Sequence, residues 1–224
     1  RKRYMRFLSD IELDDGELIK AHCPNPGSMM GLKEPGSRVF VSESDNPKRK
    51  LKYTFELIEA DGVLVGINTG HPNALVAEAI ENGTIVELSG YASLRREVKY
   101  GKNSRIDLLL EDPDKGRCFV EVKNVHLRRT PDLVEFPDSV TSRGAKHLDE
   151  LSAMVDEGHR AVMVFLVQRD DGQSLALARD IDPAYGEAFD RAAKAGVEML
   201  AYSCSVTETE IKAYRRIPIG DVPA

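Results

Sequence analysis

The feature that most constrains the fold of this chain is an uninterrupted apolar run, Ala161–Val167, directly after Arg160. A strand with one face in water would alternate apolar and polar side chains, and this segment does not. Short runs of this kind are typical of a central strand that is covered on both faces. The run is also far shorter than the ~20 residues that a membrane-spanning helix needs.

Around this strand the sequence predicts a mixed domain over residues 69–224. Apolar residues recur at helical spacing within residues 75–80, 145–155 and 183–195. The other segments resemble strands and lie at 93–100, 104–110, 117–125, 197–204 and 207–214. A helix, three strands, a helix and the buried strand make an α+β or α/β sandwich, without the regular alternation of a dinucleotide-binding fold.

Residues 1–68 are predicted to form a small all-β domain instead. Turn signals such as Asp14-Asp15-Gly16 and Asp61-Gly62 separate the strand candidates. These candidates lie at 4–13, 17–22, 38–42, 50–59 and 63–67. Five short strands in this length suit an OB-like β-barrel.

Composition narrows the class of protein and its compartment. The 224 residues carry 31 Lys or Arg and 37 Asp or Glu, a formal net charge of −6, and 42% are hydrophobic. These values are typical of a globular protein and argue against a disordered chain. Cys23, Cys118 and Cys204 stand far apart, which argues against a zinc ribbon and suits a reducing compartment. We therefore expect a cytoplasmic protein without a membrane partner, and the sequence allows a homo-oligomer.

Two carboxylates interrupt apolar strand segments, Asp107 in the second strand of the domain and Glu121 in the third. Their separation of 14 residues (121 − 107) fits adjacent antiparallel strands, and Lys123 shares a face with Glu121. An unpaired buried carboxylate is unfavourable, and Mg²⁺ or Mn²⁺, which prefer oxygen ligands, would relieve that cost. We expect Asp107, Glu121 and the Val122 carbonyl to bind the metal, with Lys123 beside them.

A plainer interpretation is a strand-to-strand ion pair on a solvated sheet face, which is favoured for an isolated match of this kind. Here the match falls on two consecutive strands, and a helix that carries Glu78 precedes them. This order of elements and charges resembles the core of PD-(D/E)xK nucleases. Asp107, Glu121, Lys123 and Glu78 are therefore the candidate catalytic residues.

The helix at 142–157 carries a further polar group. Arg143, Lys146, His147 and Glu150 fall at helical spacing on one face. One interpretation is an ordinary solvent face. The other is a basic strip near a helix N-terminus, where DNA phosphates bind favourably. On the second interpretation, Arg143, Lys146 and His147 contact DNA.

Several ordered segments match one known family: Cys23–Met29, Tyr53–Leu57, Gly66–Thr69, Ser104–Asp107, Val120–Val125 and Phe136–Leu148. Through them the chain resembles the sugar fermentation stimulation protein A (SfsA) family over nearly its whole length. The resemblance implies an N-terminal OB-fold joined to a C-terminal PD-(D/E)xK domain. It also implies DNA binding, with a regulatory link to sugar metabolism.

In the OB-like part, cations offer a nucleic-acid surface that would contact mainly the DNA backbone. The predicted DNA-binding residues there are Arg6, Lys20, Arg38, Lys48, Arg49, Lys50 and Lys52. Two functions stay open: a metal-dependent deoxyribonuclease, and a non-cleaving DNA-binding regulator in which the carboxylates are structural. Carbohydrate binding is suggested only by the name of the family, and no aromatic platform supports it.

Overall fold

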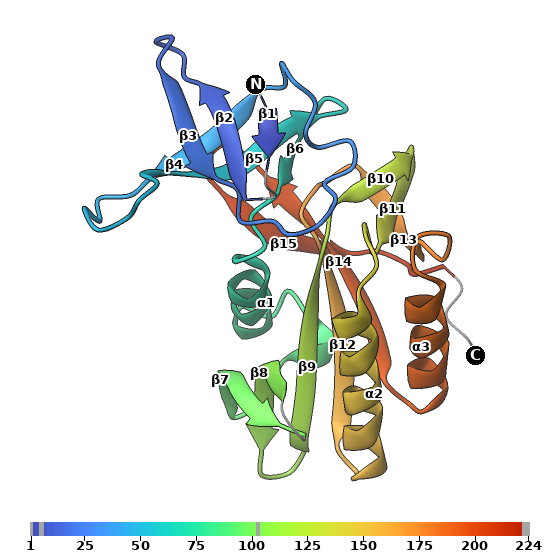
Figure 1. The fold of residues 1–224 in the computed structure, drawn as a ribbon. Coiled ribbons are helices and arrows are strands. Elements are labelled where there is room, and N and C mark those ends of the chain that lie inside the picture. The colour runs from blue at the N-terminus through green and yellow to red at the C-terminus, as the bar shows by residue number, and fades with distance from the viewer. Residues whose placement is uncertain (1, 5–6, 102–103, 221–224) are drawn as a thin grey trace.

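The computed structural model describes residues 2–4, 7–101 and 104–220. Its N-terminal region, at the top of Figure 1, is the OB domain, with a six-stranded sheet in the order β1-β2-β3-β5-β4 and with β6 paired to β5. The strands are β1 (Lys2–Tyr4), β2 (Leu8–Glu12), β3 (Leu18–His22), β4 (Val39–Glu43), β5 (Tyr53–Ala60) and β6 (Val63–Gly66). Ile11, Ile19, Phe55 and Ile58 are buried in its core.

The C-terminal region is built on a six-stranded mixed sheet in the order β15-β14-β12-β9-β8-β7. Its strands are β7 (Ser93–Tyr100), β8 (Ser104–Asp112), β9 (Gly116–Val125), β12 (Arg160–Val167), β14 (Glu198–Val206) and β15 (Ile211–Arg216). The apolar strand β12 lies at the centre, parallel to both β9 and β14, and Ala161 to Val167 are all buried. The predicted central strand and the α+β class are confirmed.

Helices cover both faces of this sheet, which explains why β12 has no polar face. Helix α1 (Pro72–Glu81) packs on one face, with a short 3₁₀ turn, η1 (Val86–Leu88), after it. Helices α2 (Ser142–Asp156) and α3 (Pro183–Lys194) pack on the other face. Within the described ranges, no helix is long and apolar enough to cross a bilayer.

The helices begin where the sequence supplies caps. The Thr141 side chain accepts a hydrogen bond from Gly144 N at the start of α2, and Asp182 accepts one from Tyr185 N at the start of α3. Pro72 occupies the first turn of α1, where its missing N–H leaves no donor unsatisfied. These contacts satisfy backbone groups that a helix terminus leaves without a partner.

A small three-stranded sheet was not predicted. It joins β10 (Leu127–Thr130), β11 (Asp132–Phe136) and β13 (Gly172–Leu177), in the order β10-β11-β13. The first two strands are short and rich in charge, and β11 pairs in parallel with a segment about 40 residues away. Local patterning carries little information about such a pairing.

The two regions are joined by a buried arginine. Arg169, 1% exposed, follows β12 and donates to Asp171, to the His126 carbonyl and to Asp61 in the β5–β6 turn of the OB domain. Nearby, a Cβ on Gly66 would lie 2.5 Å from Gln168 Oε1, so the end of β6 and the end of β12 approach closely. The predicted domain boundary at residues 68 and 69 falls between β6 and α1 and stays a prediction.

Candidate functional site

The centre of the site is the point where two neighbouring strands separate. The ladder between β8 and β9 ends at the pair Leu108–Val120. Beyond it, the Asp107 side chain takes the place of the backbone partner, because its Oδ2 accepts a hydrogen bond from Val122 N at 2.8 Å. The N–H and C=O of one strand residue point to the same side, so the Val122 carbonyl also faces the Asp107 side of β9.

Asp107 has a second partner on the helix that precedes the strands. Asn73 Nδ2, in the first turn of α1, donates to Asp107 Oδ1 at 2.8 Å. Burial and the negative charge of Glu121 raise the pKa of Asp107 to about 6, although the hydrogen bonds from Val122 and Asn73 oppose the shift. The ionised form of Asp107 is therefore less favourable in the folded protein than in water.

If the register between β8 and β9 is continued by one residue pair, Glu121 lies opposite Asp107. Glu121 is buried and only 2% exposed. Its Oε1 accepts a hydrogen bond from Lys123 Nζ at 2.6 Å and also contacts His147 Nδ1. Burial alone would raise the pKa of Glu121, but His147 and Lys123 outweigh burial and lower it. Its Oε2 is buried and, among the described residues, has no hydrogen-bond partner.

The neighbours of His147 indicate which tautomer of the ring fits its contacts. Arg143 Nε, which carries hydrogen, donates to His147 Nε2 at 3.3 Å, so Nε2 is the accepting nitrogen. The tautomer that fits this contact carries its hydrogen on Nδ1, which then donates to Glu121 Oε1. The 3.3 Å approach of Lys123 Nζ to Nδ1 is accordingly a contact between two donors. Arg143, one turn before His147 on α2, thus acts on Glu121 through the imidazole.

A cavity of about 360 Å³ lies between the two regions of the protein. Its walls include Asp107, Glu121, Lys123, Arg143 and His147. Its remaining walls are Pro26, Thr69, Pro72, Asn73, Asn124, Thr141 and Gly144. Pro26 belongs to the OB domain, whereas Thr141 and Gly144 form the start of α2. The cavity therefore brings together two carboxylates, an ammonium group, a guanidinium group and a helix N-terminus.

The structure corrects two predictions about this site. Glu78 is exposed on α1, outside the cavity, and interacts electrostatically with Lys212 on β15 instead of Asp107. His147 does not lie on a solvent-exposed face, because its side chain is 8% exposed and faces Glu121. Lys146 is exposed as predicted, and its ammonium group lies 3.5 Å from Glu150.

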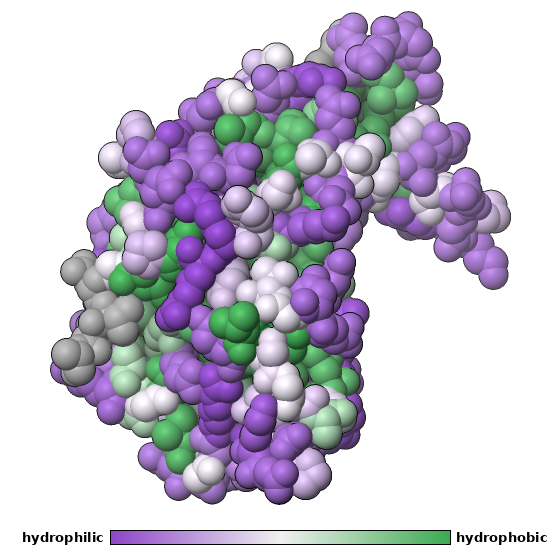
Figure 2. All heavy atoms as spheres, turned by 180° about the vertical axis from the view of Figure 1, so that it is seen from behind, coloured by the Kyte–Doolittle hydropathy of each residue, from purple (hydrophilic) through white to green (hydrophobic). Residues whose placement is uncertain are grey.

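The predicted DNA-binding cations of the OB domain are spread over several elements. Lys20 is exposed on β3, Lys52 pairs with Glu43, and Arg38 pairs with Glu208 from the other region. Arg6 lies outside the described residues. Lys48, Arg49 and Lys50 are exposed on the loop between β4 and β5, which projects as an arm in Figure 1. Figure 2, seen from behind, shows this arm as a hydrophilic lobe.

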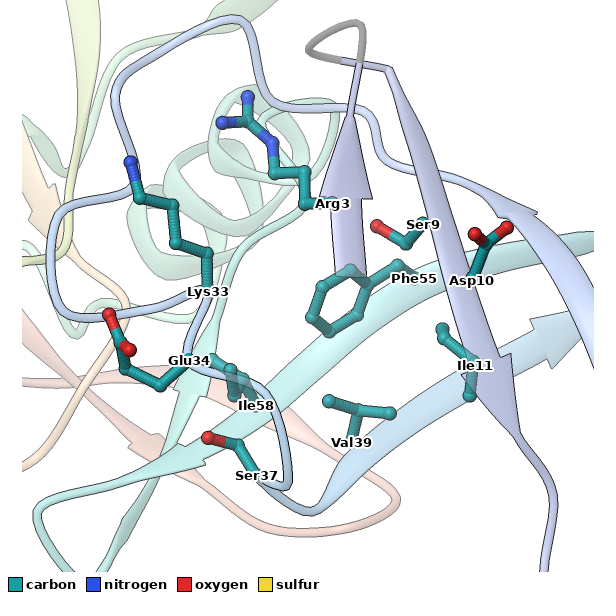
Figure 3. Close-up of a pocket in the computed structure, with 10 residues that line it drawn as sticks. All are labelled: Arg3, Ser9, Asp10, Ile11, Lys33, Glu34, Ser37, Val39, Phe55 and Ile58. Carbon is teal, nitrogen blue, oxygen red and sulfur yellow. The ribbon is translucent and has the colours of Figure 1, made fainter. Parts of the chain in front are cut away.

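A further cavity lies in the OB domain, among the residues of Figure 3, and has a volume of about 30 Å³. That volume holds about one or two water molecules, so it excludes a ligand the size of a nucleotide. Arg3, on its border, donates to the carbonyls of Asn25 and Gly27 at 2.7 and 3.0 Å. Arg3 therefore fixes the loop that carries Pro26 into the larger cavity.

Sequence reasoning missed Asn73 and the role of Arg143 in orienting His147. A polar residue in the first turn of α1, directly after Pro72, was the available signal for Asn73. Helical spacing alone did place Arg143 and His147 one turn apart, but it could not show which side of α2 faces Glu121.

Comparison with known proteins agrees with this architecture. The family described as the SfsA N-terminal OB domain matches residues 2–67, and the Sugar fermentation stimulation protein RE domain matches residues 70–210. A sugar fermentation stimulation protein homolog of Rhodospirillum centenum is 62% identical over 98% of this chain and 94% of its own length. A sugar fermentation stimulation protein homolog of Brucella ovis is 55% identical over 99% of this chain and 93% of its own length. The solved structure of Pyrococcus furiosus SfsA in complex with Ca²⁺ matches with a TM-score of 0.88 and 26% identity, over 97% of this chain and 92% of that chain.

The raised pKa of Asp107 predicts a pH-dependent effect of Asp107→Asn on stability. Between about pH 4 and 6, Asp107 is mostly ionised in the unfolded chain and mostly protonated in the folded one. Above pH 6 the carboxylate is ionised in both states, and its ionised form destabilises the folded state. Below pH 4 it is protonated in both states, and this destabilisation is absent. A rise of the Asp107 pKa from its usual 3.8 to about 6 corresponds to roughly 3 kcal/mol. The free energy of unfolding of the variant, relative to wild type, should therefore fall by about that amount from pH 8 to pH 4. Urea unfolding measures it, with Asp149→Asn on the exposed face of α2 as control, and an equal response of both variants would contradict the assignment.

Proposed function

The chain belongs to the sugar fermentation stimulation protein family, and on that premise we propose that it binds DNA and hydrolyses phosphodiester bonds with a divalent cation. The observation that carries the proposal is the pair Asp107 and Glu121 in one cavity, with Glu121 Oε2 buried and unpartnered among the described residues. Two facing carboxylates repel each other, and a bound cation would relieve both that repulsion and the unsatisfied oxygen.

The donor set fits a hard cation that keeps part of its water shell. Among the described residues, no three His, Cys, Asp or Glu side chains form a metal-binding group. Asp107, Glu121 and the Val122 carbonyl would supply oxygen ligands, and Mg²⁺ usually takes one or two carboxylates with water and phosphate. The match to Pyrococcus furiosus SfsA, solved in complex with Ca²⁺, supports a site for an oxygen-preferring cation.

The residues around the carboxylates suit a phosphate substrate. A bound cation would lower the pKa of a coordinated water and offset charge on the phosphate oxygens. Lys123 is held by Glu121 Oε1, and its ammonium group has further donors for a phosphate oxygen or for the attacking water. Arg143 and the start of α2 offer positive charge on the same cavity wall.

One observation favours the second function, a DNA-binding regulator that does not cleave. Glu121 Oε1 already has two partners, Lys123 and His147, so the cluster is partly satisfied as a structural network. In that case Asp107 and Glu121 would stabilise the strand ends, and DNA would bind elsewhere on the cationic surface. The two functions differ in metal dependence, which the following experiment measures.

Metal binding should stabilise the protein through the two carboxylates. At about 100 times the Kd, Mg²⁺ or Mn²⁺ would add ~2.7 kcal/mol to the free energy of unfolding, which thermal unfolding detects as a rise in Tm. Asp107→Asn and Glu121→Gln should each remove the rise, and Glu78→Gln, which changes an exposed carboxylate on α1, should keep it. Metal-dependent scission of DNA should follow the same order, and an unchanged metal response in the first two variants would remove the site.

DNA binding should be mainly electrostatic and should depend on the arm between β4 and β5. Each phosphate contact contributes about 0.9 to the slope of log affinity against log salt. Replacing Lys48, Arg49 and Lys50 with Ala should weaken binding to unrelated sequences about equally and flatten the slope by up to about 2.7. A control triple variant, Arg191→Ala, Lys194→Ala and Lys212→Ala, removes the same charge elsewhere and should change the slope less. Equal effects of the two triple variants would contradict a DNA contact by the arm.

A further inference from the structure

A loop of the OB domain, residues 24–29, bridges one side of the cavity that holds the two carboxylates. At one end, the Pro24 carbonyl accepts hydrogen bonds from Thr69 N and Thr69 Oγ1 at 3.0 and 2.8 Å, shortly before α1. At the other end, Met29 N donates to Asp138 Oδ2 at 3.1 Å, in the segment before α2. This bridging loop therefore reaches from the start of α1 to the start of α2.

The bridging loop is held by further contacts. Asn25 is 1% exposed, donates to the Ile67 carbonyl at 2.9 Å and accepts from Gly27 N at 2.9 Å. A Cβ on Gly27 would lie 2.4 Å from Asp138 Oδ2, so the loop packs directly on that carboxylate. Pro26, in the middle of the loop, lines the cavity. Widening the cavity at Pro26 would thus break contacts within the loop and at both of its ends.

The charged groups of the site lie deep in this cavity. The side chains of Glu121, His147 and Lys123 are 2%, 8% and 14% exposed, so a phosphate has to enter the cavity to reach them. A volume of 360 Å³ is near the lower end of the range for small-ligand pockets and accommodates about one nucleotide. A duplex can place a nucleotide in such a space only if that nucleotide leaves the stack.

Two exposed apolar side chains flank the end of the bridging loop, one from each region of the protein. Val140 is 75% exposed and directly precedes Thr141, which lines the cavity. Met30 is 44% exposed and directly follows the bridging loop. Single exposed apolar residues are ordinary, but both of these lie within two residues of the contact between Met29 and Asp138. Apolar side chains at such a position can pack against bases that have lost their stacking partners.

Positive charge accompanies these apolar side chains on both sides. Arg143, in the first turn of α2, is exposed and lines the cavity. Lys33 is exposed next to the bridging loop, where its Nζ donates to the Ser28 carbonyl at 3.0 Å. These cations would attract the phosphates of nucleotides on either side of the cavity. The surroundings of the cavity therefore offer apolar contacts for bases together with positive charge for the backbone.

From these observations we infer that the site takes an unpaired DNA strand and excludes an intact duplex. One nucleotide enters the cavity with its phosphate toward the carboxylates, and the neighbouring bases pack against Met30 and Val140. The inference rests on the proposed function for the binding of DNA at this cavity, but not for cleavage. An intact duplex meets only the outer cationic surface, and it reaches the cavity where its strands are separated.

Fluorescence anisotropy with short oligonucleotides tests the inference without relying on cleavage. The measurement uses Ca²⁺, the cation of the related solved structure, under conditions in which gel electrophoresis shows that the DNA stays intact. A single strand of about 12 nucleotides should bind wild type at least about tenfold more tightly than the blunt duplex of the same sequence. A duplex of that length with an unpaired gap should bind like the single strand.

A double variant connects this preference to the cavity. Met30→Ser with Val140→Ser should weaken single-strand binding at least about tenfold and change duplex binding less than about twofold. Val86→Ser is the matched control, because Val86 on η1 is 70% exposed and of the same residue type as Val140. The control should bind both forms of DNA like wild type. Thermal unfolding establishes that each variant is folded.

The outcomes separate this inference from the proposed cleavage. Equal binding of single strand and intact duplex by wild type would overturn the inference, as would an unchanged preference in the double variant or an equal loss in the Val86→Ser control. A single-strand preference that the double variant loses, without metal-dependent scission, would support the inference and contradict cleavage. Scission of intact duplex as fast as of single strand would support cleavage and overturn the inference.

Discussion

The site depends on the hydrogen bond that Val122 N donates to Asp107 Oδ2. In this bond a side-chain carboxylate takes the place of the backbone carbonyl that would otherwise accept from Val122 in the β8–β9 ladder. It lets β8 leave β9 without an unsatisfied N–H in the interior, and it fixes Asp107 beside Glu121. The position is unfavourable for charge, because both carboxylates are largely buried and the pKa of Asp107 rises to about 6. Lys123, His147 and Asn73 offset part of this cost, yet Glu121 Oε2 stays without a partner among the described residues. This remaining imbalance is the observation behind the proposed cation site.

The OB domain contributes to the walls of the site. The His71 imidazole at the start of α1 lies 2.9 Å from Glu56 on β5, and this pairing raises the pKa of His71. The same helix turn carries Asn73 to Asp107. On the other side, Met29 N donates to Asp138, which ties the Pro26 loop to the segment before α2. Contacts between the two regions thus hold residues on opposite walls of one cavity.

Hydrophobic periodicity predicted the central strand β12, the helices α2 and α3, and the neighbouring strands β8 and β9. It could do so because each of these elements buries a continuous apolar face. It therefore placed Asp107, Glu121 and Lys123 together, although their chemical roles stay predictions. It was wrong for Glu78, since α1 turns Val76, Ala79 and Ile80 toward the sheet and leaves Glu78 in solvent. It could not show that His147 is buried, because a buried imidazole is tolerated only where a partner such as Glu121 lies across the interface. The small sheet was missed because β11 and β13 pair across a long sequence separation.

The central claim, that this cluster cleaves DNA and is not merely structural, is tested most directly by Lys123→Ala. Transition-state interactions change the rate of the chemical step more than ground-state affinity. The measurement is strand scission with Mg²⁺ or Mn²⁺ at saturating DNA, for wild type and the variant, with DNA affinity determined on the same samples. We predict scission by wild type, an affinity of the variant within a few-fold of wild type, and no detectable scission by the variant. Absence of scission by wild type on linear, nicked, branched and single-stranded DNA with either metal would contradict the account and favour the non-cleaving regulator.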